Sequence, residues 1–290
     1  AVMKENRIRG SQQKLLRTMR TDKDFQYASP DALLARYKQL QQQVGARLPT
    51  LLGTLPKAPL EIRAVEADRA ASAAAVSYQP PLPDGMRPGV LSVNTSALPS
   101  RRRWSAPAQF LHEGIPGHHV QLGLQQELDK LPRFRRLGGD VAFVEGWGLY
   151  AESLGDALGV YQDPYERIGY LQGALTRSAR MVADTGVHAQ GWSKKQAVDY
   201  LVKTADMPVA DATAEVERFM ALPGQTLANG LGELKMIELR DKAQRTQGAS
   251  FDPKRFHAEV LRDGSMPLDI LEAKIDRWIA APAAVPTPTR

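Results

Sequence analysis

The chain has 290 residues, of which 43% are hydrophobic and 24% charged, the proportions of an ordinary soluble globular protein. It has no cysteine, which excludes disulfide scaffolds, thiol nucleophiles and thiolate metal sites. The 38 lysines and arginines exceed the 32 aspartates and glutamates, giving a net charge of +6, but the basic residues are scattered. We therefore expect a solvated basic face and no nucleic-acid partner.

No stretch of the sequence approaches the ~20 consecutive apolar residues that span a bilayer, so membrane insertion is not expected. The N-terminal segment AVMKENRIRG is polar and basic and lacks the apolar core of a signal peptide. We therefore expect neither an integral membrane protein nor an uncleaved secretory precursor.

Helical periodicity recurs along most of the chain. Over residues 31–52 apolar residues recur at spacings of three and four after the cap residue Ser29, which predicts an amphipathic helix. The same pattern predicts helices at residues 107–131, 142–158, 164–184, 193–205, 211–222, 227–243 and 267–280. Ser105 and Ser193 are candidate N-caps for two of them.

One section of the sequence differs from this helical pattern. Residues 61–69 and 89–95 bracket a Pro/Gly-rich loop, and alternation over 89–95 predicts a strand. We expect a mainly α fold, with a single helical domain over residues 1–280 and a small β-sheet preceding the histidine cluster. The Pro-rich tail, residues 281–290, is expected to be disordered.

Three of the five histidines lie within eight residues, in the segment FLHEGIPGHHVQ. A His-Glu pair followed by a second histidine on one helix is how zinc hydrolases hold a metal beside a general base. On a regular helix His118 would lie on the wrong face relative to His112, and His119 would be about 10.5 Å along the axis. Pro116-Gly117 can distort a helix, so we expect a bulge that returns His118 to the metal.

The next predicted helix supplies two carboxylates. Glu145 and Glu152 are seven residues apart and therefore lie on one face of the helix, two turns apart. Most of the residues around them are apolar, and carboxylates on a buried helix are expected to be paired or metal-bound. One carboxylate can hold the metal while the other orients a ligand histidine.

These motifs resemble those of a bacterial family of domain-of-unknown-function proteins marked by HExxPGHH and EGWxxYxE. That family is similar to the glutamate-type zinc peptidases, such as thimet oligopeptidase, angiotensin-converting enzyme and the thermostable carboxypeptidases. The resemblance covers roughly residues 20–275 and implies a zincin-like catalytic domain, one Zn²⁺ ion and a peptide substrate. It implies these roles: metal ligands His112, His118 and Glu145, general base Glu113, and supporting residues His119 and Glu152.

The resemblance also makes His188 the candidate for stabilising the tetrahedral intermediate, although residues 184–188 fit a capped helix end equally well. Arg177 and Arg180 are candidates to bind a substrate carboxylate, and they fit equally well as ion-pair partners of buried glutamates. Asn94 and Tyr150 are further candidate substrate contacts. Strand 89–95 is expected to pair with the substrate backbone as an edge strand.

Two features depart from the family pattern. Family members are about twice as long, so the chain resembles their C-terminal half, and we expect association with an N-terminal half. Asn229 stands where relatives carry a tyrosine. Three functions therefore stay open: a zinc peptidase, a zinc-binding pseudoenzyme or partner-binding fragment, and a zinc hydrolase of a non-peptide amide. A periplasmic or secreted location is favoured over a cytoplasmic one, because such relatives often carry export signals.

Overall fold

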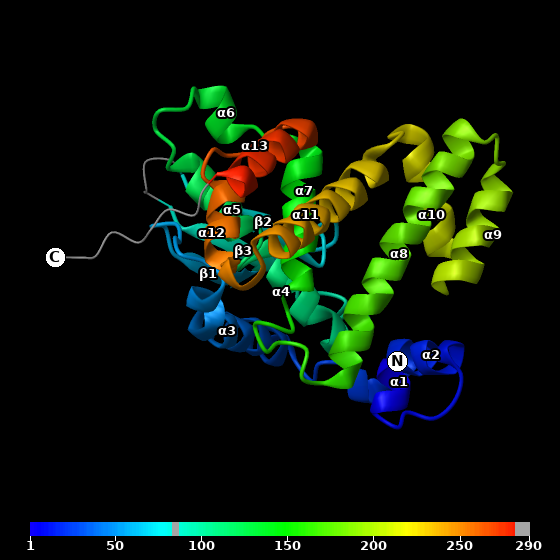
Figure 1. Ribbon diagram of the computed structural model, residues 1–290. Coiled ribbons are helices and arrows are strands. Elements are labelled where there is room, and N and C mark those ends of the chain that lie inside the picture. Colours follow the sequence, from blue (N-terminus) through cyan, green and yellow to red (C-terminus); the bar gives the residue numbers. More distant parts are fainter. Residues whose placement is uncertain (83–86, 282–290) are drawn as a thin grey trace.

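The computed structural model describes residues 1–82 and 87–281, and most of them are helical (Figure 1). The helices are α1 Val2–Glu5, α2 Gln12–Thr21, α3 Pro30–Arg47, α4 Ala106–Glu113, α5 His118–Gln126, α6 Arg133–Leu137, α7 Val141–Ser153, α8 Pro164–Ala189, α9 Lys194–Ala205, α10 Val209–Ala221, α11 Gln225–Gln247, α12 Pro253–Leu261 and α13 Leu268–Ala280. The strands are β1 Leu60–Ala64, β2 Val76–Gln79 and β3 Gly89–Val93. The mainly helical class with a small sheet ahead of the histidine cluster is therefore confirmed.

The three strands form one sheet in the order β1-β3-β2. β3 pairs in parallel with β1 and antiparallel with β2, so it is the central strand. The expectation that strand 89–95 offers a free edge to a substrate is therefore wrong, because both of its edges are already hydrogen-bonded within the sheet. β2 was not predicted, and it supplies one of the two edges.

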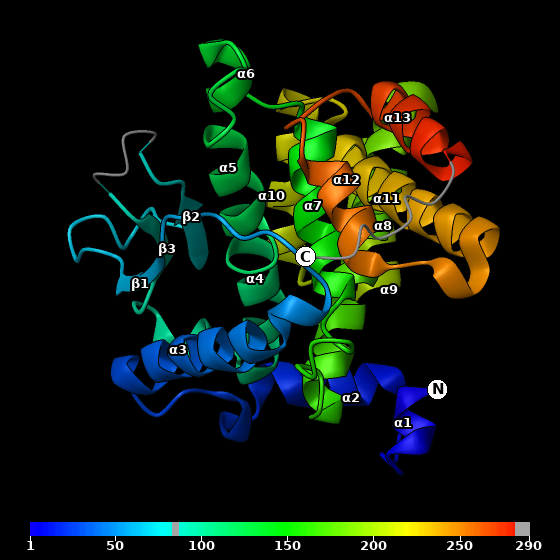
Figure 2. The ribbon, with the colours of Figure 1, turned by 60° about the vertical axis from the view of Figure 1, so that its left-hand side comes forward.

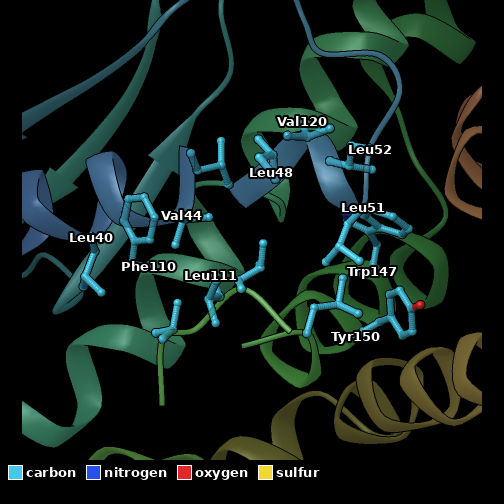
Figure 3. Packing of buried hydrophobic residues seen from close by; sticks show 14 of the residues in the cluster. Leu40, Val44, Leu48, Leu51, Leu52, Phe110, Leu111, Val120, Trp147 and Tyr150 are labelled. Atoms are coloured by element: carbon cyan, nitrogen blue, oxygen red, sulfur yellow. The ribbon is translucent and has the colours of Figure 1, made fainter. Parts of the chain in front are cut away.

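The helices that carry the histidine and glutamate motifs stand in layers beside this sheet. In Figure 2 the sheet lies to the left, α4 and α5 stand next to it, and α7 and α11 follow towards the right. Apolar side chains fill the space between the layers, with Leu40 and Val44 of α3 facing Phe110 and Leu111 of α4 near Trp147 of α7 (Figure 3). This core fixes the position of α4 relative to α7.

The helices α8, α9 and α10 pack around a second, smaller core that includes Ala183, Leu201 and Phe219. Figure 1 shows these three helices to one side, joined to the rest through the long helix α11. α8 continues five residues beyond its predicted end at residue 184, so His188 lies within the helix. This arrangement brings arginines of α8 and α10 to the same side of the molecule.

One of the two predicted N-caps is confirmed and the other is wrong. Ser193 caps α9 in a reciprocal capping box with Gln196, as predicted. Ser105 does not cap α4: its hydroxyl donates to the carbonyl of Arg102 instead. The helices α1, α2, α6 and α12 were not predicted. The predicted disorder of the tail, residues 281–290, lies almost entirely outside the described residues. Among the described helices, none has the length and apolar character to cross a bilayer.

Candidate metal centre

The predicted helix over residues 107–131 is divided in two, and the division builds the site. α4 ends at Glu113 and α5 begins at His118, with Pro116-Gly117 between them. The buried indole of Trp147, on α7, donates a hydrogen bond of 2.9 Å to the carbonyl of Pro116. The break lets the chain change direction, because proline cannot continue the hydrogen-bond pattern of a helix.

The break brings together the three residues predicted as metal ligands. Nε2 of His112 lies 3.7 Å from one carboxylate oxygen of Glu145, and Nε2 of His118 lies 3.9 Å from the other. The two imidazole rings are 4.7 Å apart between centroids and nearly perpendicular. One ligand atom from each residue lies within 4.8 Å of the others, so the three side chains surround a common point.

Hydrogen bonds on the far side of each ring fix which nitrogen faces this point. Nδ1 of His112 lies 3.0 Å from the carboxylate of Glu152, whose other oxygen accepts from Arg177 at 3.0 Å. Nδ1 of His118 lies 3.3 Å from the side-chain oxygen of Gln121. Both Nε2 atoms are left to face Glu145, which is the arrangement that metal-binding histidines require.

A glycine on α7 allows His112 to reach this position. A Cβ atom added to Gly148 would lie 2.7 Å from Nε2 and Cε1 of His112, closer than real Cβ contacts. The imidazole therefore lies directly against the helix backbone, one turn beyond Glu145. Any larger residue at position 148 would push the ring out of the cluster.

The charges around the cluster favour a cation. Burial opposes a charge on His112, but the carboxylates of Glu145 and Glu152 outweigh it and raise the pKa of His112 to about 10. The same imidazole lowers the pKa of Glu145. Burial lowers the pKa of His118 to about 4, which keeps that imidazole neutral and able to donate its lone pair.

Glu113 lies beside the cluster in a different environment. Burial raises the pKa of Glu113 to about 7, and the backbone N–H of Tyr78, on β2, hydrogen-bonds to its carboxylate and opposes the rise. A carboxyl group that titrates near neutrality can both accept and release a proton under physiological conditions. The sequence did not indicate this link between Glu113 and the sheet.

His119 does not support the metal ligands, so its predicted role is wrong. Its ring turns away from His112 towards the sheet, where Nδ1 lies 3.0 Å from the hydroxyl of Tyr78. Burial lowers the pKa of His119 to about 4. His119 therefore holds α5 against β2, and touches the cluster only through the strand residue that contacts Glu113.

Three other predicted site residues lie elsewhere. Asn94 is buried, and its amide bonds to Ala70 and Ala73 carbonyls and to Ser96, so no group is free for a substrate. Tyr150 is fully buried and its hydroxyl contacts His257. His188 lies eleven residues beyond Arg177 in α8, about 16 Å along the axis, and pairs with Asp184. The structure therefore does not bring these three to the cluster.

Asn229, the residue noted for its departure from the family, contacts a ligand instead. It lies on α11, and its Nδ2 donates to the Glu145 carboxylate at 3.3 Å. Its Oδ1 is shielded from solvent and has no partner in the described part of the chain. The residue can therefore orient the Glu145 carboxylate.

A cavity of about 230 Å³ opens beside the cluster, and both Glu145 and Asn229 line it. Its other walls include Arg177 and Arg180, the two arginines singled out from the sequence, and Arg218, which was not. Gln121 was also missed. Its three-residue spacing from His118 on one helix is a signal that could have found it, whereas nothing local indicates that α10 turns Arg218 to the same cavity.

Comparisons with known proteins give the chain's relatives without giving an activity. A family described as "Bacterial protein of unknown function (DUF885)" matches residues 1–275. A solved structure described as "the putative lipoprotein from Colwellia psychrerythraea" is 31% identical, with a TM-score of 0.89 over 96% of the chain. A second, "a putative lipoprotein of unknown function from Shewanella oneidensis", is 22% identical with a TM-score of 0.77 over 90%.

The chain spans 48% of the length of each of these two solved structures. No curated protein matches it.

Proposed function

Because the chain belongs to the bacterial DUF885 family, whose function is unknown, we propose its activity from the site itself: it is a zinc-dependent peptidase. His112, His118 and Glu145 would hold the ion, and Glu113 would act as general base. The observation that carries the proposal is the convergence of two Nε2 atoms and one carboxylate beside a buried glutamate of raised pKa. On this proposal the helical domain is zincin-like.

The residues fit a zinc ion by both chemistry and spacing. Two imidazoles and one carboxylate are a ligand set of catalytic zinc sites, which keep a fourth position open. Ligand atoms about 2 Å from a tetrahedral ion lie about 3.3 Å from one another. The Nε2 atoms of His112 and His118 lie 3.7 and 3.9 Å from the two different carboxylate oxygens of Glu145, which is somewhat longer than that value, so small side-chain shifts would close the site around the ion.

When bound, the ion would supply Lewis-acid chemistry, making water a nucleophile near neutral pH and polarising a substrate carbonyl. The chain's own residues would manage the protons and the orientation. Glu113 would accept a proton at its carboxylate and later deliver it to the leaving amine, for which a pKa of about 7 is well matched. Glu152 and Gln121 would keep the two imidazoles oriented throughout.

A location outside the cytoplasm is part of the same proposal. Both solved neighbours are described as putative lipoproteins, a class of protein that is exported. This supports a periplasmic or secreted protein, as expected from the resemblance. A chain without cysteine is compatible with such an oxidising compartment.

A zinc-binding protein without turnover is the second candidate. The position of Asn229 favours this alternative, because Asn229 contacts Glu145 and the family resemblance places a tyrosine there. It predicts that the chain binds stoichiometric zinc but cleaves neither peptides nor other amides.

The test combines metal analysis of the purified chain with two cleavage assays, one on a peptide library and one on a set of non-peptide amides. We expect one zinc per chain and peptide cleavage. Glu113→Gln should retain the zinc and lose turnover by about 10²–10⁴-fold, since general-base catalysis contributes that much. Glu217→Gln removes an exposed carboxylate on α10 and should change neither property. Absence of zinc from the wild-type chain, or loss of zinc together with activity in Glu113→Gln, would contradict the proposal.

A further inference from the structure

We propose that Arg180 and Arg218, with Arg177, bind the C-terminal carboxylate of the substrate, so that the enzyme acts on the end of a peptide. The inference rests on the proposed peptidase function and adds to it the substrate class and the mode of attack. It also gives Arg218, which the sequence did not single out, a part in selecting the substrate.

The three arginines reach one cavity from two helices. Arg177 and Arg180 lie on α8 and Arg218 on α10, and their side chains are 21%, 31% and 37% exposed. They are therefore accessible to a small molecule but partly withdrawn from bulk water, where an ion pair is stronger than on an open surface. Glu145 lines the same cavity, so a molecule bound there lies next to the metal cluster.

The three arginines have only two carboxylates as direct ion-pair partners within the described residues. Arg180 and Arg218 both pair with one carboxylate, that of Glu215, each at 2.9 Å. Arg177 pairs with Glu152, which also receives Nδ1 of His112. Three guanidinium groups thus pair directly with two carboxylates. Glu145, which lines the cavity, is a proposed zinc ligand, so the arginines keep donors for an anion bound beside it.

Unsatisfied donors point to the same conclusion. The Nε atoms of Arg177 and Arg180 are shielded from solvent and have no hydrogen-bond partner among the described residues. A guanidinium presents five N–H donors in a planar fork that matches the two oxygens of a carboxylate. The two Nε atoms are too buried to reach the cavity, but the side chains are partly exposed, and a terminal carboxylate in the cavity could accept from their other N–H groups.

The size of the cavity favours the end of a peptide over its middle. Its volume of about 230 Å³ is smaller than the ~300–1,000 Å³ of sites that enclose drug-sized ligands. It has room for about one terminal residue with its carboxylate. The side-chain carboxylate of an aspartate or glutamate within a peptide could bind the same arginines. The experiment must therefore distinguish a side-chain carboxylate from a C-terminal one.

The experiment measures binding, so it does not depend on turnover. The protein is the Glu113→Gln variant, loaded with zinc by dialysis, and binding is measured by titration calorimetry. The three peptides differ only at the C-terminal end: one ends in Ala with a free carboxylate, one in Ala-amide and one in Glu-amide. We expect the free acid to bind about 10- to 100-fold more tightly than both amides, since hydrogen bonds to charged groups contribute that much. Equal affinity for the acid and Ala-amide, or equal affinity for the acid and Glu-amide, would overturn the inference.

Variants connect this preference to the cavity. Arg180→Gln and Arg218→Gln should each reduce the acid-to-amide ratio by about tenfold. Arg277→Gln, which removes the same charge from an exposed position on α13, should leave the ratio unchanged. An unchanged ratio in both cavity variants, with circular dichroism showing them folded, would also overturn the inference. The zinc content and peptide cleavage of the wild-type chain test the peptidase function. The acid-to-amide ratio tests recognition of the terminal carboxylate, so either proposal can be contradicted without the other.

Discussion

Glu152 connects the candidate metal centre to the arginine-lined cavity. One carboxylate oxygen contacts His112 and the other accepts from Arg177, while only 6% of the side chain is exposed. A buried carboxylate with two partners is held in one orientation, and it holds both partners in turn. The residue was predicted to orient a ligand histidine, and its contact with Nδ1 of His112 agrees with that role.

Replacing Glu152 with glutamine should weaken zinc binding about 10- to 100-fold, the usual effect of removing a group that orients a ligand histidine. The amide keeps the size of the side chain but removes the charge that favours the oriented imidazole. Competition with a chromophoric chelator measures the affinity.

Glu166→Gln is the matched control for this change. Glu166 also pairs with an arginine, Arg36, at 2.6 Å, but it has no contact with the cluster. Its replacement should leave the zinc affinity unchanged. Equal losses in both variants would mean that the effect comes from general destabilisation and not from the orientation of His112.

At the scale of elements, the site depends on how closely α4 approaches α7. Gly148 provides the surface on which the His112 ring lies. In Gly148→Ala the new methyl group would overlap the ring, and overpacking of this kind costs about 1–3 kcal/mol of stability. Since the displaced atom is Nε2, the affinity for zinc should fall in the same variant.

Gly45→Ala makes the same substitution where there is space. Gly45 lies within α3, and a Cβ atom there would meet nothing within 4 Å. Because glycine is unfavourable within helices, this variant should gain about 0.5–1 kcal/mol and bind zinc normally. Urea denaturation and the chelator assay measure the two properties. Retention of full zinc affinity by Gly148→Ala would show that the ring can be accommodated elsewhere.

Site residues on one helix, or on helices adjacent in sequence, could be predicted, whereas residues brought together by packing of distant helices could not. His112 and His118 are six residues apart, so a local argument about one proline and one glycine was enough to expect them to converge. The apolar residues around Glu145 and Glu152 indicated that one of the two carboxylates would hold the metal, and the choice of Glu145 came from the family resemblance. The role of Arg218 depends on the packing of α8 against α10, which no local pattern records.

The predictions that were wrong also concern features that tertiary packing decides. β3 alternates as an edge or a central strand would, and only its pairing with both β1 and β2 decides between them. Asn94 and Tyr150 read as polar groups near a motif, but tertiary packing buries both with internal partners. His119 follows His118 directly, so once α5 forms, the two rings must point in different directions.

At the scale of the whole molecule, a buried histidine connects the N-terminal and C-terminal parts of the chain. His257, on α12, lies between the carbonyl of Leu51 and the hydroxyl of Tyr150, each at 2.8 Å. A neutral imidazole satisfies both, since Nδ1–H donates to the carbonyl and Nε2 accepts from the hydroxyl. A protonated ring would have a second donor facing the hydroxyl and would carry a charge in the core.

Acid should therefore destabilise the fold through His257. Burial lowers its pKa to about 4, below the 6.5 expected in the unfolded chain. Between these values the unfolded chain binds more protons, so stability falls as the pH decreases from 6.5 towards 4, by about 3 kcal/mol for this residue. His257→Gln cannot titrate in this window; it should be less stable than wild type at pH 7, and the difference should shrink as the pH falls. Urea denaturation of both proteins with EDTA at pH 7, 6, 5 and 4.5 measures this, and parallel losses in the two proteins would assign the acid sensitivity to other groups.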